Sequence, residues 1–300
     1  MRLLLCIVAI FLTQTIWGAT FDEAAPPGKN YAKAEFRLWL PDDPGKIKAV
    51  AVLVPGSNGD GRAAVDDPVW QAFARKHQLG LAGCHFTDKP HDQSFVEEYA
   101  NVSQGSGQAL LDVLAAFGSK AQHPELATAP LLLWGMSAGG QFNYEFVAWK
   151  PERVIAFVVN KGGIYYTALT PPAARAVPGI LFIGGKDLES RIDIITGLFA
   201  LNRRGGALWA LAKEPDAAHI VGKSRDVAIV FFEDVMALRL GDGGMLKPLA
   251  EASGFLGDPH EKTVRPMGEG KPPGYPVAWL PTMRVANAWQ AMETGKAVEQ

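Results

Sequence analysis

The feature that most constrains the fold is an apolar run that ends abruptly in a serine framed by glycines. Residues 131–140 read LLLWGMSAGG. Gly135 and Gly139 complete a G-x-S-x-G pattern, in which small residues two positions either side let Ser137 occupy a strained turn with its hydroxyl exposed. Aromatic residues then recur at helical spacing until Pro151. The pattern predicts a strand, a sharp turn at Ser137 and a helix; the alternative is a tight turn with an incidental serine.

Apolar runs alternate with amphipathic stretches up to about residue 240. The predicted strands are residues 34–40, 47–54, 79–84, 131–136, 154–159, 179–183 and 207–211. The predicted helices cover residues 67–79, 96–117, 138–150 and 223–240. Strands that alternate with helices indicate βαβ units, which build a mostly parallel sheet. The sequence therefore predicts an α/β fold with a mostly parallel central sheet and helices on both faces.

The last fifth of the chain has a different composition. Residues 241–281 are rich in glycine and proline and lack a long periodic segment. Trp279 and a short final helix with Met283, Ala286 and Trp289 are expected to hold this segment on the core. We therefore expect one domain over residues 20–240, followed by an irregular extension over residues 241–300 that packs on it.

Charge and composition restrict the kinds of partner. With 300 residues, of which 48% are hydrophobic, the chain can bury a sizeable core. Its 29 basic and 31 acidic residues leave a formal charge of −2, so no global field attracts nucleic acid or an anionic membrane. Small or neutral partners are favoured, and the sequence leaves the oligomeric state open.

The first residues resemble a secretory signal peptide. Arg2 precedes an apolar run over residues 3–12, and the small pair Gly18-Ala19 follows. The run is shorter than the roughly 20 residues that span a bilayer, so an uncleaved anchor is the lesser alternative. We expect removal of residues 1–19 and a secreted or periplasmic protein. Cys84 would then be the single cysteine, which excludes an intrachain disulfide.

Two other motifs are considered and set aside. The glycine-rich segment over residues 55–61 is followed by Arg62-Ala63, where a phosphate-binding P-loop requires lysine and serine or threonine. The segment from Cys84 to Asp92 contains several residues of metal-ligand type, but Cys84 and His85 would point to opposite faces of a strand. The sequence therefore predicts neither a nucleotide site nor a metal site.

The exposed serine suggests nucleophilic chemistry. A serine hydroxyl is a poor nucleophile near neutral pH, so Ser137 requires a neutral imidazole as base and a carboxylate to orient it. Of the two histidines downstream, His219 follows a predicted strand, whereas His260 lies in the extension. Asp187 directly follows strand 179–183 and so emerges at the same sheet edge as Ser137. The competing carboxylates are Glu189, Asp193 and Asp216.

On these motifs, the block from about Ile47 to Leu240 resembles the α/β-hydrolase superfamily of serine hydrolases. Its turn resembles those of secreted polyhydroxybutyrate depolymerase-like and feruloyl or acetyl-xylan esterase-like enzymes, and the order Ser137, Asp187, His219 agrees with the superfamily. The resemblance implies an oxyanion hole made by the backbone amide of Ala138 and a second amide, from Ser57 or Asn58. Many members have His-Gly before that second donor, whereas this chain has Pro55-Gly56.

The resulting hypothesis is a secreted serine esterase that acts through an acyl-enzyme and requires no metal or organic cofactor. Its substrate would be a small or polymer-linked ester, and Tyr165 and Tyr166 are candidates for lining the pocket. A serine peptidase related to the prolyl oligopeptidase group and a non-catalytic binding protein on the same scaffold are the alternatives.

Overall fold

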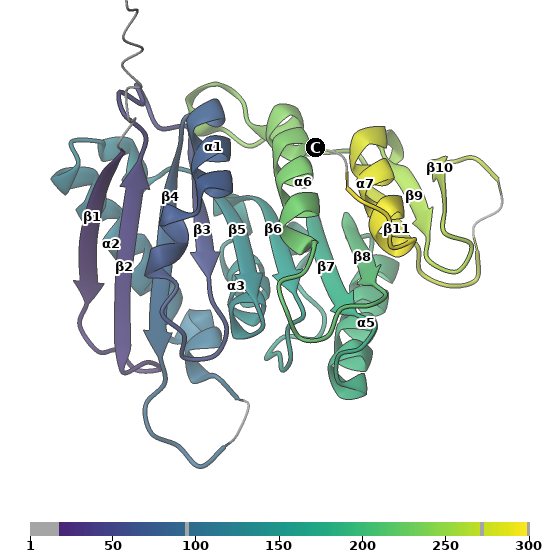
Figure 1. Ribbon diagram of the computed structural model, residues 1–300, viewed down its shortest axis with the longest axis horizontal. Coiled ribbons are helices and arrows are strands. Elements are labelled where there is room, and N and C mark those ends of the chain that lie inside the picture. The colour runs from purple at the N-terminus through teal and green to yellow at the C-terminus, as the bar shows by residue number, and fades with distance from the viewer. Residues whose placement is uncertain (1–17, 94–95, 271–272, 299–300) are drawn as a thin grey trace, which may run out of the picture.

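The computed structural model describes residues 18–93, 96–270 and 273–298, and it is built around one eight-stranded sheet (Figure 1). The strand order is β1-β2-β4-β3-β5-β6-β7-β8. The strands are β1 (Ala19–Ala25), β2 (Lys33–Leu40), β3 (Ala49–Val54), β4 (Leu79–Thr87), β5 (Leu131–Met136), β6 (Val154–Asn160), β7 (Gly179–Gly184) and β8 (Trp209–Glu214). Strands β4, β3, β5, β6, β7 and β8 are parallel, and β1 and β2 add an antiparallel edge.

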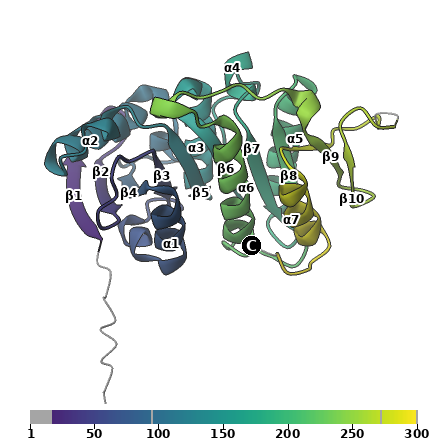
Figure 2. The ribbon, with the colours of Figure 1, turned by 90° about the horizontal axis from the view of Figure 1, so that it is seen from above.

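Helices cover both faces of this sheet, as the view from above shows (Figure 2). They are α1 (Pro68–His77), α2 (Ser106–Lys120), α3 (Ala138–Trp149), α4 (Pro172–Arg175), α5 (Glu189–Arg204), α6 (Ser224–Arg239) and α7 (Met283–Glu293). Helices α2, α3 and α5 lie on one face, and α1, α6 and α7 lie on the other. The α/β architecture predicted from the sequence is confirmed.

Alternation along the central strands produces two hydrophobic cores, one on each face. In β3, Val50, Val52 and Val54 face the core that contains Leu110 of α2 and Phe142 of α3. Ala49, Ala51 and Leu53 face the core that contains Trp70 of α1 and Val230 of α6. Because successive strand side chains point to opposite faces, a strand covered on both faces is apolar throughout. That is why residues 49–54 are all buried.

Helix α2 and strand β1 differ from the sequence-based expectation. Helix α2 begins at Ser106 rather than near Val96, because Gly105 has φ 139° and interrupts the helix; short 3₁₀ turns precede it. Strand β1 was not expected, because its residues follow directly on the predicted leader. Its outer position exposes much of it, so its apolar signal is weak.

The C-terminal extension contains more regular structure than its composition indicates. Three short strands, β9 (Phe255–Asp258), β10 (Thr263–Pro266) and β11 (Ala278–Leu280), form a small antiparallel sheet in the order β10-β9-β11. As expected, Trp279 is buried, and its indole N–H donates to the Glu251 carbonyl at 2.9 Å. Trp289 of α7 donates to the Leu211 carbonyl of β8 at 2.7 Å, which joins the extension to the main sheet.

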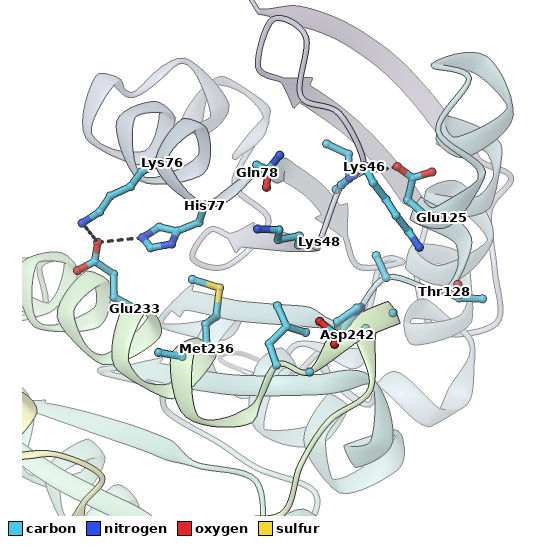
Figure 3. A pocket seen from close by; sticks show the side chains of 18 residues that line it. Lys46, Lys48, Lys76, His77, Gln78, Glu125, Thr128, Glu233, Met236 and Asp242 are labelled. Carbon is cyan, nitrogen blue, oxygen red and sulfur yellow. Dashed lines mark hydrogen bonds and ion pairs between the residues drawn. The ribbon is translucent and has the colours of Figure 1, made fainter.

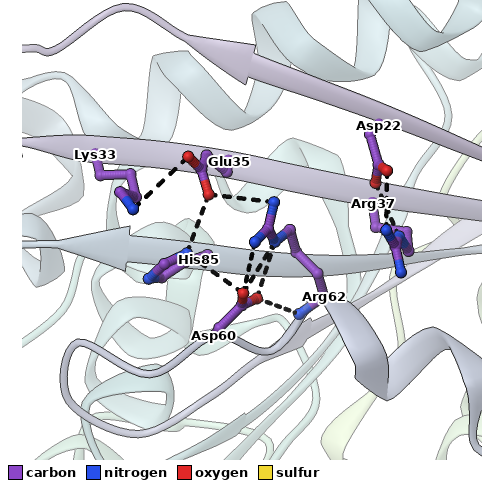
Figure 4. A network of polar contacts seen from close by, with 7 residues as sticks. All are labelled: Asp22, Lys33, Glu35, Arg37, Asp60, Arg62 and His85. Carbon is purple, nitrogen blue, oxygen red and sulfur yellow. Dashed lines mark hydrogen bonds and ion pairs between the residues drawn. The ribbon is translucent and has the colours of Figure 1, made fainter.

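A polar network covers the outer strands near β4 (Figure 4). Nδ1 of His85 lies 3.2 Å from Oε2 of Glu35, and Arg62 forms ion pairs with both Glu35 and Asp60. Neighbouring Cys84 is fully buried, and burial raises the pKa of its thiol. In the part of the chain that the structure describes, no group of three or more His, Cys, Asp or Glu side chains could hold a metal ion.

The predicted signal peptide, residues 1–19, falls almost entirely on residues 1–17, which lie outside the described residues. Among the helices of residues 18–93, 96–270 and 273–298, none is long and apolar enough to span a membrane.

Candidate active site

Ser137 occupies the turn between β5 and α3 in a conformation that few non-glycine residues adopt. Its φ and ψ are 54° and −121°, and its N–H donates to the Asn160 carbonyl at 2.8 Å. Positive φ is sterically costly for a residue with a Cβ, and such strain is typical of functional sites. The turn therefore projects Ser137 from the carboxyl edge of the sheet.

The two glycines of the motif allow the backbones to approach closely. A Cβ on Gly139 would lie 2.2 Å from the Val54 carbonyl oxygen, and one on Gly135 would lie 2.2 Å from the carbonyl oxygen of Gly139. Both contacts are with backbone atoms, which cannot move aside as a flexible side chain would. The G-x-S-x-G pattern is thus a packing requirement of the strand-turn-helix unit.

His219 and Asp187 lie beside Ser137, as predicted. Nε2 of His219 is 3.0 Å from Oγ of Ser137, and Nδ1 of His219 is 2.8 Å from Oδ2 of Asp187. Asp187 follows β7, and His219 lies in the connection between β8 and α6. Three segments that are adjacent at one edge of the sheet thus contribute one of these residues each. Serine, imidazole and carboxylate form a continuous hydrogen-bonded chain, with the histidine tautomer set by these two contacts.

Hydrogen bonding keeps Asp187 ionised despite its burial. Its side chain is 3% exposed, against 29% for His219. Burial tends to raise the pKa of Asp187, but hydrogen bonds from His219, the Leu188 N–H and Arg191 outweigh burial and lower it. Oδ1 accepts from Leu188 at 2.7 Å and from Arg191 at 3.0 Å. Oδ2 is therefore the oxygen directed at the imidazole.

The segment after β3 brings further backbone amides close to Ser137. A Cβ on Gly56 would lie 3.6 Å from Cβ of Ser137. The N–H of Asn58 is engaged, because it donates to the Tyr99 hydroxyl at 3.3 Å. Within the described residues, the N–H of Ser57 has no hydrogen-bond partner. Ala138 is the first residue of α3, where backbone N–H groups lack a partner in the helix.

No protein-family model matches this sequence, and no curated protein matches it. Solved structures do resemble it. A ferulic acid esterase gives a TM-score of 0.55 at 11% identity, covering 75% of this chain and 100% of that chain. A poly(3-hydroxybutyrate) depolymerase from Bordetella parapertussis gives 0.52 at 17% identity, covering 76% and 92%. Poly(aspartic acid) hydrolase-1 from Sphingomonas sp. KT-1 gives 0.50 at 19% identity, covering 71% and 97%.

These likenesses agree with the sheet order and with the turn at Ser137. The chain has the α/β-hydrolase fold. In this fold, ligands bind outside the carboxyl ends of the parallel strands, where Ser137, Asp187 and His219 meet.

The competing carboxylates and histidine lie elsewhere in this fold. Asp216 is exposed and forms an ion pair with Lys186 at 3.0 Å. Glu189 is the first residue of α5. His260 packs against Tyr275 in the extension, with ring centroids 4.5 Å apart. None of these three has a hydrogen bond to His219 or Ser137 among the described residues.

Sequence reasoning missed two residues that support the site. The backbone carbonyl of Asn160, the last residue of β6, accepts from the Ser137 N–H, and Arg191 in the first turn of α5 donates to Asp187. A polar residue at the end of an apolar run is a signal that could have identified Asn160. Arg191 has only its spacing of four residues from Asp187, which is not specific.

The adjacent tyrosines separate into two environments. Tyr165 is partly buried and packs edge-on against Tyr144, with ring centroids 5.0 Å apart. Tyr166 is 43% exposed, and its hydroxyl donates to the Glu97 carbonyl at 3.0 Å. Tyr165 therefore packs against the core, and Tyr166 is the more exposed of the two.

Cavities lie at both ends of the sheet. One of about 350 Å³ borders the candidate site and is lined by Ser57, Asn58, Asp88 and Glu97, among others. Another, of about 540 Å³, lies at the opposite edge, before β3 and β5, and is lined by Lys48, His77 and Glu233 among others (Figure 3). Neither cavity is lined by Ser137, Asp187 or His219, but the first is lined by Ser57 and Asn58, the two candidates for the second oxyanion donor.

Proposed function

We propose that this protein is a serine hydrolase of carboxylic esters. The observation that carries the proposal is the continuous chain Ser137 Oγ, His219 imidazole, Asp187 carboxylate, with separations of 3.0 and 2.8 Å. Such a chain supplies a serine with a base and supplies the base with an orienting carboxylate. The position of these three residues at the carboxyl edge of a sheet with the α/β-hydrolase fold supports the same function.

In the acylation step, Oγ of Ser137 would attack the ester carbonyl carbon while Nε2 of His219 takes the hydroxyl proton. The carbon–oxygen bond to the alcohol then breaks, and the same nitrogen returns the proton to the leaving alcohol. Asp187 would stabilise the imidazolium that forms between these events without itself becoming protonated. Water, activated by His219, would attack the acyl-enzyme, release the acid and restore Ser137.

The oxyanion would be held by two backbone amides. The Ala138 N–H is available at the start of α3, where the helix dipole also favours negative charge. Of the two candidates for the second donor, Ser57 is favoured, because the Asn58 N–H donates to Tyr99. Asn58 instead fixes the segment: its side-chain carbonyl accepts from the Asp88 N–H at 2.8 Å.

The substrate would be a small or polymer-linked ester, and the reaction requires no metal or organic cofactor. Two of the similar structures are named as a ferulic acid esterase and a poly(3-hydroxybutyrate) depolymerase, which supports ester substrates. Between β6 and β7 the structure has only one short helix, α4, so no large helical lid covers Ser137 from this segment. We further propose export through the N-terminal leader, with residues 20–240 as the catalytic domain.

The test combines covalent labelling with turnover. Wild-type protein should react with a fluorophosphonate probe and hydrolyse p-nitrophenyl esters, whereas Ser137→Ala should do neither while keeping its melting temperature. Ser119→Ala, which alters an exposed serine on α2, is the matched control and should behave as wild type. Hydrolysis of peptide substrates in preference to esters would indicate a peptidase. A wild-type protein that neither labels nor turns over any ester would refute the proposal.

A further inference from the structure

A lysine is buried beneath the segments that carry the three candidate catalytic residues. The side chain of Lys161 is 0% exposed, and its Nζ lies 3.1 Å from Oε2 of Glu214. The same Nζ lies 3.1 Å from Oδ1 of Asn160. A charged ammonium group is rarely buried this completely unless it is paired with an opposite charge. The Lys161 side chain can therefore be buried because Glu214 pairs with it.

The backbone around Lys161 joins the two strands next to β6. Its own N–H donates to the Phe182 carbonyl of β7 at 3.0 Å, and its φ is 51°. The preceding carbonyl, that of Asn160, accepts from the Ser137 N–H at the end of β5. The Asn160 side-chain amide donates to the Val221 carbonyl at 3.3 Å, two residues beyond His219. Residues 160 and 161 therefore contact the Ser137 turn, β7 and the segment that carries His219.

Glu214 connects the lysine to both ends of that segment, residues 215–223, which we call the histidine loop. Glu214 is the last residue of β8, and its Oε1 accepts from the Lys223 N–H at 2.9 Å. Gly222 has φ 57°, and a Cβ there would lie 2.1 Å from Oε2 of Glu214. The loop thus folds tightly around one carboxylate, which closes its base.

Burying Lys161 and Glu214 removes two charged groups from water, which costs free energy that a pair of apolar residues would not cost. Burial lowers the pKa of Lys161, and the nearby Glu214 carboxylate offsets only part of that effect. Replacing a buried ion pair with apolar residues is often neutral or stabilising, so stability alone does not explain this one. A buried pair can, however, fix one arrangement of the segments that carry it.

We propose that Lys161 and Glu214 form a positioning pair that holds the histidine loop in register with Ser137. The structural part of this inference, that the pair orders the loop, is independent of the reaction. Its catalytic consequence rests on the proposed esterase function. Among the described residues, neither Lys161 nor Glu214 has a hydrogen bond to Ser137 or His219, so both act through the backbone of the loop.

The first experiment compares Lys161→Met with Lys186→Met by hydrogen–deuterium exchange. Methionine keeps an unbranched stem of similar length and removes the charge. Lys186 is the control because its ion pair with Asp216 is solvent-exposed. In Lys161→Met, peptides covering residues 215–223 should exchange about tenfold faster or more, while the core strands exchange as in wild type. Lys186→Met should leave the loop unchanged.

The second measurement separates positioning from binding. In Lys161→Met, kcat should fall by about 10- to 100-fold with KM within about twofold, because a misplaced imidazole impairs proton transfer without altering substrate contacts. Glu214→Gln should retain more of kcat than Glu214→Ala, because its amide oxygen can still accept from Lys223 or from Lys161 although the carboxylate charge is lost. Glu214→Ala should lose as much as Lys161→Met.

Unchanged loop exchange in both Lys161→Met and Glu214→Ala would overturn the inference, whether or not the protein hydrolyses esters. Faster exchange with unchanged kcat would overturn its catalytic part. If Lys161→Met does not fold, the comparison of Glu214→Gln with Glu214→Ala decides the question. Absence of ester turnover in wild type would refute the proposed function and leave the exchange result as the test of loop ordering.

Discussion

Replacing Asp187 with asparagine should abolish most of the proposed ester hydrolysis through the tautomer of His219 rather than through loss of structure. Oδ1 of Asp187 accepts from two donors, the Leu188 N–H at 2.7 Å and the Arg191 guanidinium at 3.0 Å. In the asparagine variant, the amide oxygen should take this position, because the amide NH₂ cannot accept from either donor. The NH₂ group then replaces Oδ2, the atom that lies 2.8 Å from Nδ1 of His219.

An amide N–H that faces Nδ1 of His219 requires Nδ1 to be unprotonated and to accept a hydrogen bond. The proton of the neutral imidazole then resides on Nε2, the atom 3.0 Å from Oγ of Ser137, where a base is needed. The wrong tautomer, together with the lost carboxylate charge, should lower kcat by about 10³- to 10⁴-fold. At about 1.4 kcal/mol per factor of ten, that is about 4–5.5 kcal/mol of transition-state stabilisation.

The assay is steady-state hydrolysis of a p-nitrophenyl ester, with thermal melting as the check on folding. Asp187→Asn should keep KM and its melting temperature close to the wild-type values, because the amide preserves the shape of the carboxylate. Asp216→Asn is the control, since Asp216 is an exposed carboxylate only three residues before His219. If Asp187→Asn retains kcat within about tenfold of wild type, or Asp216→Asn loses it, the assignment of the acid is wrong.

Three further predictions test other parts of the molecule. Gly139→Ala should fail to fold or melt far below wild type, because its Cβ would lie 2.2 Å from the Val54 carbonyl oxygen; a melting temperature equal to that of wild type would contradict the packing argument. Burial raises the pKa of Glu293 from 4.5 to about 7, so the unfolded chain loses this proton first and stability falls as pH rises between those values. Glu293→Gln should therefore stabilise the protein at pH 8, by up to about 3 kcal/mol, and not at pH 4; equal effects in urea unfolding at the two pH values would refute this. Intact-mass measurement of the exported protein should show loss of about residues 1–19, and a mature form that retains Met1 would exclude cleavage.

Local patterns were sufficient to predict much of this fold. The strands over residues 131–136, 154–159 and 179–183 are each within about one residue of β5, β6 and β7, because strands covered on both faces must be apolar throughout. The turn at Ser137 was predictable because the G-x-S-x-G pattern is contained in five consecutive residues, although Gly139 is also required by a close approach to Val54 of β3. Where local signals were weak, at β1 and at the start of α2, prediction failed.

The sequence by itself determined the order Ser137, Asp187, His219 and the sheet edge at which they emerge, because parallel strands bring their carboxyl ends to one edge. Only the tertiary structure decided which atoms meet: that Oδ2 of Asp187 faces the imidazole, and that the Asn58 amide is occupied by Tyr99. It alone revealed the Lys161–Glu214 pair, which joins residues 53 positions apart. Such contacts depend on the orientation of side chains and on the path of loops, which are fixed by packing between segments that are distant in the chain. A single sequence contains no pattern that shows which distant segments pack together.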